Sequence, residues 1–113
     1  MGSQLELLDE IRKDVTKFKQ ELPDAMAAHT AFQDEVYKDG ALSLKVKRLI
    51  ALGIALRAGC LPCILHQTKL AVEAGASKDE VLETTSVVVS MSGTTGNAES
   101  LRVIKLLEEL GKW

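Results

Sequence analysis

Two cysteines and a histidine within seven residues have the types and spacing needed for thiol chemistry. Cys60 and Cys63 are the only cysteines of the 113-residue chain, and His66 follows three residues later. A thiolate is a nucleophile, a second thiol nearby can convert its oxidised form into a disulfide, and an imidazole one helical turn away can accept the thiol proton. The spacing therefore predicts a dithiol redox site with the three side chains on one helix face.

The residues around the cysteines predict that this site opens a helix. Gly59 is expected to end one helix, and Pro62 fits the first turn of the next because it has no N–H to donate there. Unpaired amides and the partial positive charge of a helix N-terminus stabilise a thiolate. We therefore expect a lowered thiol pKa, and sulfurs close enough to form a disulfide.

Three alternatives compete with a redox site: haem attachment, a zinc site and ordinary core packing. Attachment of a c-type haem needs histidine directly after the second cysteine, where Ile64 stands instead. A structural zinc site needs four ligands, and the segment offers three, so His29 would have to supply the fourth from another helix. His29 is otherwise expected at the surface or in helix packing. The plainest alternative is two small core residues and a histidine satisfied on a helix face.

Length and composition predict one globular domain over residues 1–113. Hydrophobic residues make up 46% of the chain and charged residues 27%, while 4% are aromatic, so the core must be aliphatic. The net charge is -2 and no basic tract occurs, which argues against a nucleic-acid partner. The densest basic cluster, Lys45, Lys47 and Arg48, is expected to be the solvated face of a helix.

No segment predicts secretion or a membrane partner. The first 20 residues are amphipathic and charged, unlike a secretory signal. The longest uncharged run, 84–98, is too short and too polar to cross a bilayer. We therefore expect a cytoplasmic protein, and in such a chain two close cysteines favour a catalytic or metal-binding role over a structural disulfide.

Apolar periodicity and capping signals predict an all-α fold. Pro23 fits a first helical turn, Ser43 is a candidate N-cap, and Ser77 with Glu80 forms a capping box. The helix from Ser77 has no charge between Thr84 and Met91, which predicts burial against a second subunit, with a central helix of a monomeric bundle as the alternative. About six helices are expected, over 4–20, 23–37, 44–58, 60–74, 78–93 and 99–112.

Two stretches, "SLKVKRLIALGIALRAGCLPC" and "AVEAGASKDEVLET", resemble the carboxymuconolactone decarboxylase superfamily, in its alkylhydroperoxidase D-like branch. The resemblance covers about Leu42 to Gly96. It implies a compact all-helical subunit that forms a homo-oligomer, commonly a trimer or hexamer. Members with both cysteines act as thiol-dependent peroxidases or disulfide reductases. Cys63 would then be the attacking thiol and Cys60 the resolving one.

The chain departs from that branch at two positions. The branch has a glutamate twelve residues before the first cysteine, where Arg48 stands here, and a histidine four residues after the second, where Gln67 stands. His66 is one residue early, and a shift of one residue turns a side chain by about 100° around a helix. Arg48 would lower a thiol pKa if it faced the cysteines. Gln67 and Arg48 are therefore candidates for groups that support His66. The sequence does not decide which residues would form the proton relay.

These observations predict an antioxidant enzyme of the peroxiredoxin type. Cys63 would attack a hydroperoxide or disulfide, Cys60 would resolve the product, His66 would be the base, and an external dithiol would restore both thiols. No metal or organic cofactor is expected. Two alternatives remain: a decarboxylase-type lyase acting on a small carboxylate or lactone, and a non-catalytic oligomeric binding module.

Overall fold

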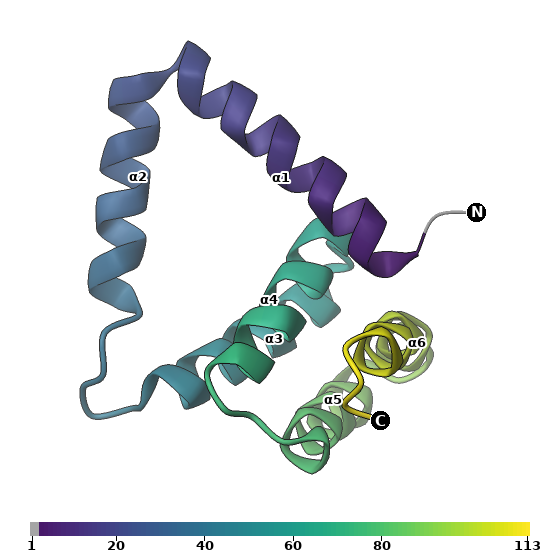
Figure 1. The fold of residues 1–113 in the computed structure, drawn as a ribbon. Coiled ribbons are helices and arrows are strands. Elements are labelled where there is room, and N and C mark those ends of the chain that lie inside the picture. The colour runs from purple at the N-terminus through teal and green to yellow at the C-terminus, as the bar shows by residue number, and fades with distance from the viewer. Residues whose placement is uncertain (1–2) are drawn as a thin grey trace.

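The computed structural model has six α-helices and no strand over the residues that it describes (Figure 1). It describes the backbone of residues 3–113 and the side chains of 3–93 and 98–113. The all-α prediction is confirmed. No helix in this part of the chain is both long and apolar enough to cross a membrane. The helices are α1 (Gln4–Glu21), α2 (Pro23–Val36), α3 (Leu44–Ala58), α4 (Leu61–Glu73), α5 (Lys78–Ser92) and α6 (Thr94–Glu109).

The capping signals of the sequence set most helix boundaries. Ser43 accepts a hydrogen bond from the backbone N–H of Val46, and Ser77 forms the expected capping box with Glu80. The prediction that the last helix begins at residue 99 is wrong. Gly93, at φ 65°, turns the chain by itself, and α6 begins at the next residue.

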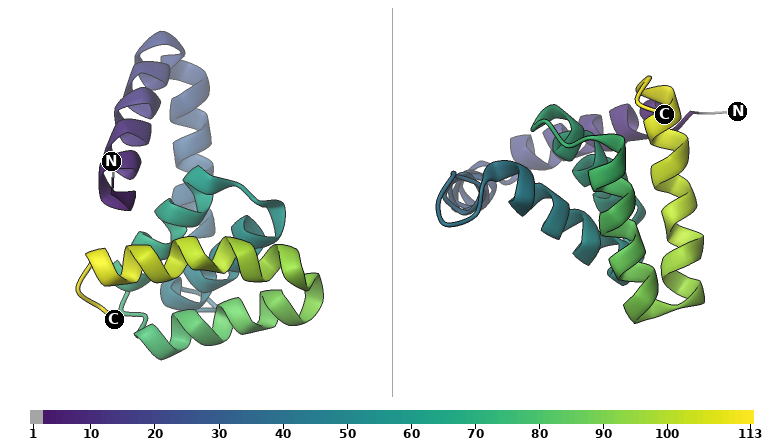
Figure 2. Two further views of the ribbon diagram at one scale, coloured as in Figure 1. Left: turned by 90° about the vertical axis from the view of Figure 1, so that its right-hand side faces the viewer. Right: turned by 90° about the horizontal axis from the view of Figure 1, so that it is seen from below.

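Helices α3 to α6 enclose the main hydrophobic core. In Figure 2, α5 and α6 run side by side, and they pack across the pair formed by α3 and α4. The core is aliphatic, as the low aromatic content predicted. Its buried members are Leu52, Ala55, Leu56, Ile64, Ala71, Ala76, Val81, Val88, Val103 and Leu107.

Helix α1 is fixed to this core only near its start. Leu8 packs with Leu65 and Leu106 in a second buried cluster, and burying one such leucine stabilises the fold by roughly 1.5–3 kcal/mol. The Glu109 carboxylate accepts hydrogen bonds from the backbone N–H groups of Gln4 at 3.0 Å and Leu5 at 2.9 Å. Such a cap contributes about 1 kcal/mol. The N-terminal end of α1 is therefore held by α4 and α6.

The rest of α1 and all of α2 form an arm that reaches away from the core. Figure 1 shows the two helices as an open V beside α4, and α2 packs mainly against α1. No residue of α2 is buried, and the Phe32 side chain is 66% exposed. The predicted apolar stripe of α1 continues into this arm, where Val15 and Phe18 are exposed in the single chain.

The uncharged part of α5 has an open outer face. Val87 is 63% exposed and Met91 is 83% exposed, and Ile50 and Ile54 of α3 are also exposed beside them. Within the single chain, α5 is therefore not enclosed on all sides. This apolar patch needs a partner if it is to be covered.

Candidate functional site

The two cysteines lie where the sequence predicted, at the start of a helix. Gly59 ends α3 in the left-handed conformation, with φ 70°, which glycine adopts without strain. Cys60 is the N-cap of α4, and its backbone N–H donates to the carbonyl oxygen of Ala55 at 3.2 Å. Both thiols are free. Cys60 is half-buried, and Cys63, in the first turn, is exposed. Cys63 therefore presents the more accessible sulfur.

The expected lowering of the thiol pKa does not occur at Cys63. A side-chain hydrogen bond with Cys60 raises the pKa of Cys63 to about 11, and burial and the negative charge of Cys60 act in the same direction. The backbone N–H at the helix start lowers this pKa, but by less. The neighbouring sulfur thus outweighs the helix N-terminus, and Cys63 keeps its proton at neutral pH.

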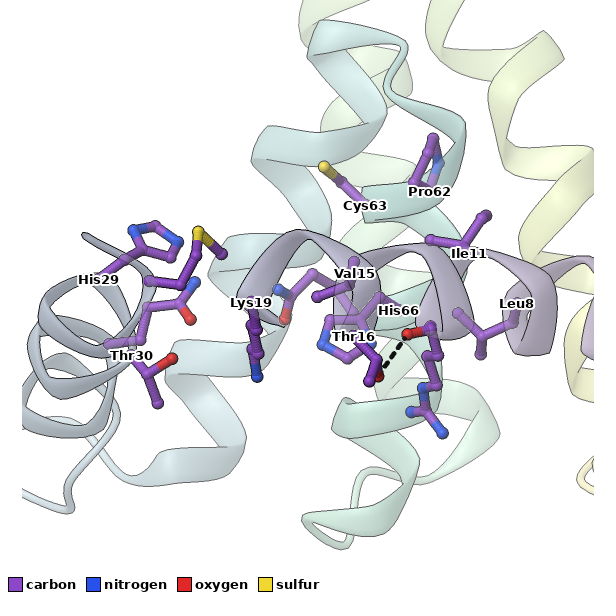
Figure 3. Close-up of a pocket in the computed structure, with 14 residues that line it drawn as sticks. Leu8, Ile11, Val15, Thr16, Lys19, His29, Thr30, Pro62, Cys63 and His66 are labelled. Carbon is purple, nitrogen blue, oxygen red and sulfur yellow. Dashed lines mark hydrogen bonds between the residues drawn. The ribbon is translucent and has the colours of Figure 1, made fainter. Parts of the chain in front are cut away.

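Cys63 opens onto a pocket of about 510 Å³ between the arm and α4 (Figure 3). Pro62, His66 and Gln67 line it from α4, whereas Cys60 does not line it. The walls are largely apolar, with cationic and hydroxyl groups between the apolar side chains. Helix α1 supplies Leu8, Ile11, Arg12, Val15, Thr16 and Lys19, and α2 supplies Met26, His29, Thr30 and Gln33.

His66 is poised to act as a neutral base. Burial lowers its pKa below 6.5, and the positive charges of Arg12 and Arg48 lower it further, while Glu73 opposes them. The imidazole is therefore uncharged at pH 7, the form that accepts a proton. His66 and Cys63 share the pocket, but no hydrogen bond joins them among the described residues. Proton transfer between them needs a side-chain movement or a bridging molecule.

The two positions that depart from the family pattern are in direct contact. Arg48 Nη1 donates to Gln67 Oε1 at 3.3 Å. The guanidinium also lies 3.6 Å from the centre of the Tyr37 ring, a cation–π contact. Arg48, Gln67 and His66 line a second cavity of about 290 Å³ together with Tyr37. An arginine–glutamine pair therefore occupies the two positions where the resemblance in the sequence led us to expect a glutamate and a histidine.

The basic cluster of α3 is not a solvated face, so that prediction is wrong. Besides Arg48, Lys45 forms an ion pair with Glu80 at 2.9 Å. Lys47 Nζ donates to the carbonyl oxygen of Val36 at 2.7 Å, at the end of α2. Each cation therefore has a partner in another part of the fold, which periodicity within one helix cannot reveal.

We expect the substitution Arg48→Gln to raise the His66 pKa, because it removes a positive charge that disfavours the imidazolium. Because the His66 pKa is lower in the folded than in the unfolded chain, the folded state loses stability as pH falls below the unfolded value of 6.5. This loss of stability should be smaller in the Arg48→Gln variant. An NMR titration of the imidazole protons measures the shift. Arg57→Gln is the matched control, since Arg57 does not influence His66. An equal shift in both variants would contradict the assigned contact.

The zinc interpretation finds no support in the geometry. It required His29 to approach Cys60, Cys63 and His66, but Figure 3 shows His29 on α2, across the pocket from His66. Within the described part of the chain, no group of three or more histidine, cysteine and acidic side chains is placed to hold a metal ion.

Sequence reasoning missed the contribution of α1 to the pocket. Arg12, Thr16 and Lys19 line the same pocket as Cys63, and only the packing of the arm brings them there. Their spacing of four and three residues was the available signal, because it places them on one face of a helix. That face also carries Leu8 and Val15, so polar and apolar groups alternate along the pocket wall.

The fold and this site define a small helical protein with a Cys-x-x-Cys pair at a helix start. The carboxymuconolactone decarboxylase family model matches residues 23–106, and the chain belongs to that family. A carboxymuconolactone decarboxylase family protein from Legionella pneumophila is 29% identical, with a TM-score of 0.91 over 96% of this chain and 97% of that one.

Two further relatives extend the comparison. An uncharacterized protein of Cupriavidus necator is 28% identical over 103 residues, 91% of each chain. A family protein from Thermotoga maritima is 26% identical, with a TM-score of 0.71 over 77% of this chain and 90% of that one. The description of that protein links it, as a possibility, to an antioxidative response.

Proposed function

We propose that this chain is a thiol-dependent peroxidase or disulfide oxidoreductase that uses Cys63 and Cys60. One observation carries the proposal: the exposed Cys63 sulfur opens onto a pocket that also contains the neutral imidazole of His66. The Cys60 side chain is hydrogen-bonded to that of Cys63. A nucleophile, a resolving thiol and a proton acceptor are the groups that this chemistry requires.

In the proposed cycle, the thiol proton of Cys63 passes to His66 and the thiolate attacks the terminal oxygen of a hydroperoxide. The S–O bond forms as the O–O bond breaks, and the leaving alkoxide takes a proton to become an alcohol. Cys60 then attacks the sulfenic acid, which releases water and forms the disulfide. An external dithiol reduces the disulfide by two exchange steps and is itself oxidised to a disulfide.

The raised pKa of Cys63 makes the base essential in this scheme. With a pKa of about 11, little Cys63 thiolate exists at neutral pH, so deprotonation must accompany attack. His66 can accept the proton because it is neutral at that pH. Arg48 holds Gln67 beside His66 and, by its charge, helps to keep the imidazole neutral. We assign Gln67 and Arg48 this supporting role.

The family and one relative support the same class of chemistry. The chain carries the cysteine pair within the region that the family model matches. The description of the Thermotoga maritima relative mentions an antioxidative response, which fits an enzyme that consumes peroxides. A cytoplasmic location is part of the proposal, because a reducing compartment keeps both thiols ready to react.

Single-turnover oxidation tests the proposal. Reduced protein is mixed without oxygen with one equivalent of cumene hydroperoxide, and free thiols, residual peroxide and protein mass are followed. We expect loss of two thiols per hydroperoxide and a mass decrease of two hydrogens. Dithiothreitol should then restore both thiols and permit turnover. Peroxide that persists in the presence of reduced protein would refute peroxidase activity. If the reduced protein also failed to exchange with a small disulfide, the proposal as a whole would be refuted.

A lyase of the carboxymuconolactone decarboxylase type is the second candidate. The observation in its favour is the Arg48–Gln67 pair, which replaces the relay expected in the redox branch. In a lyase the cysteines would be incidental. Activity on a small lactone or carboxylate would then survive the double substitution Cys60→Ser and Cys63→Ser, whereas peroxide or disulfide turnover would not.

We also propose that the chain assembles with copies of itself, as a trimer or hexamer. The arm exposes Phe32, and the patch on α3 and α5 exposes Ile54, Val87 and Met91, although such large apolar groups are usually covered. Light scattering of the purified protein measures the molar mass. A mass equal to one chain at micromolar concentration would contradict this part of the proposal.

A further inference from the structure

The pocket beside Cys63 is positively charged. Arg12 and Lys19 line it from positions about two turns apart on α1, and its described lining contains no aspartate or glutamate. Neither cation takes part in an ion pair among the residues whose side chains are described. The positive charge of Arg12 lowers the pKa of His66, so this guanidinium lies near the imidazole. An anionic group entering the pocket would meet two cations without carboxylate partners.

The same pocket is too large and too apolar for a small peroxide alone. Its volume of about 510 Å³ lies within the range of roughly 300–1,000 Å³ typical of sites for organic ligands. A water molecule takes about 30 Å³ in the liquid, so hydrogen peroxide would fill a small part of it. Ile11, Val15 and Met26 provide apolar surface between the cationic groups. These walls suit a hydrocarbon chain.

The end of the Lys19 side chain and the Cys63 sulfur lie at different parts of this pocket. In Figure 3, the Cys63 sulfur is on one side of α1, and the end of Lys19 is on the other side, with His66. A ligand that reaches from the sulfur to the cations must therefore pass between α1 and α4, along the apolar side chains. The arrangement fits a molecule with a reactive group and a negative charge separated by a hydrocarbon chain.

We propose that the substrate of Cys63 is a hydroperoxide of a fatty acid or similar amphipathic monocarboxylate, with its carboxylate bound by Arg12 and Lys19 and its chain lying against Ile11 and Val15. This inference rests on the proposed peroxidase function and names the class of its substrate. Arg12 and Lys19 act here as specificity-determining residues, since they contact a part of the substrate that does not react.

A comparison of linoleic acid hydroperoxide with its methyl ester tests the inference, because the two probes differ only in the negative charge. We expect kcat/KM to be about three- to tenfold higher for the acid, in keeping with partly exposed charge pairs. The preference should fall as salt is added. In the double variant Arg12→Gln and Lys19→Gln, the acid-to-ester ratio should fall close to one. Any change in the chemical step itself affects both probes and cancels in this ratio.

The matched control is the double variant Lys13→Gln and Lys17→Gln. It removes the same number of positive charges from α1, but both lysines are exposed and neither lines the pocket. The control should keep the preference for the acid. A wild-type ratio of one would overturn the inference, and so would a preference that persists in the Arg12 and Lys19 variant or disappears equally in the control.

A binding measurement separates failure of this inference from failure of the proposed function. Octanoate and 1-octanol are titrated into the Cys63→Ser variant and followed by NMR, with no turnover required. Octanoate should bind more tightly, and the double substitution of Arg12 and Lys19 should remove the difference. If neutral cumene hydroperoxide is consumed but octanoate binds no better than octanol, only the substrate assignment fails. If no hydroperoxide is consumed, the peroxidase function fails, and the octanoate preference decides whether the pocket binds carboxylates.

Discussion

Replacing Cys63 by serine should reduce hydroperoxide turnover by more than about a hundredfold, because serine lacks the nucleophilic sulfur on which the proposed cycle depends. The exposed position of Cys63 in the wall of the pocket makes it the sulfur that a substrate meets first. The measurement is the rate of cumene hydroperoxide loss with dithiothreitol as reductant. Thermal unfolding of the variant, followed by circular dichroism, should stay close to that of the wild type, since the side chain is exposed.

The matched substitution Cys60→Ser should have a different signature. The Cys63 thiolate can still attack, so one equivalent of hydroperoxide should be consumed and a sulfenic acid should form. This product cannot be resolved within the chain and should be trapped by dimedone, with the label on Cys63 in the mass spectrum. If Cys60→Ser loses the first turnover and Cys63→Ser retains it, the assigned roles of the two cysteines are reversed.

Replacing Cys60 by alanine should make Cys63 more acidic. The hydrogen bond with Cys60 is the largest cause of the raised pKa of Cys63, and the charge of Cys60 adds to it. Without that sulfur, the pKa should fall from about 11 toward the ordinary value of 9.0, with burial holding it somewhat higher. Each unit of decrease gives roughly ten times more thiolate at neutral pH. Alkylation of Cys63 by iodoacetamide at pH 7.5 should therefore become about tenfold faster or more.

The variant Cys60→Ser separates the two contributions of the neighbouring sulfur. A serine hydroxyl can accept a hydrogen bond but does not ionise in this pH range, so the Cys63 pKa should lie between those of the wild type and the alanine variant. Mass spectrometry after timed alkylation gives the pKa at each cysteine. A wild-type Cys63 that titrates at or below 9.0 would contradict the assigned hydrogen bond, and so would an unchanged pKa in Cys60→Ala.

The combination of a protonated nucleophile and a neutral base has a consequence for the chemistry. An isolated Cys63 thiolate would react with many oxidants, whereas a Cys63 that keeps its proton reacts only when the base accepts it. Cys63 and His66 lie in the same pocket without a hydrogen bond between them, so in the proposed cycle a bound substrate or a water molecule has to connect them. Reactivity is then linked to occupation of the pocket.

The sequence alone predicted the parts of this protein that depend on neighbours along the chain. The capping box of Ser77 and Glu80, the left-handed Gly59 and the position of Cys60 at the start of α4 are each settled within a few residues. Local hydrogen bonds and backbone preferences decide such features, so residue type and spacing are enough. The exception was the start of α6, because one glycine was sufficient for the turn.

Only the tertiary structure decided what surrounds the cysteines. Arg48 meets Gln67 across two helices, and the Glu109 carboxylate caps α1 from 105 residues away. That cap and the packing of Leu8 direct the arm over α4 and so bring Arg12 to the pocket. Helical periodicity gives the face on which a residue lies but not the helix that this face will meet. For the same reason, the sequence predicted the dithiol, while packing lowered the pKa of His66 and set the charge of the pocket.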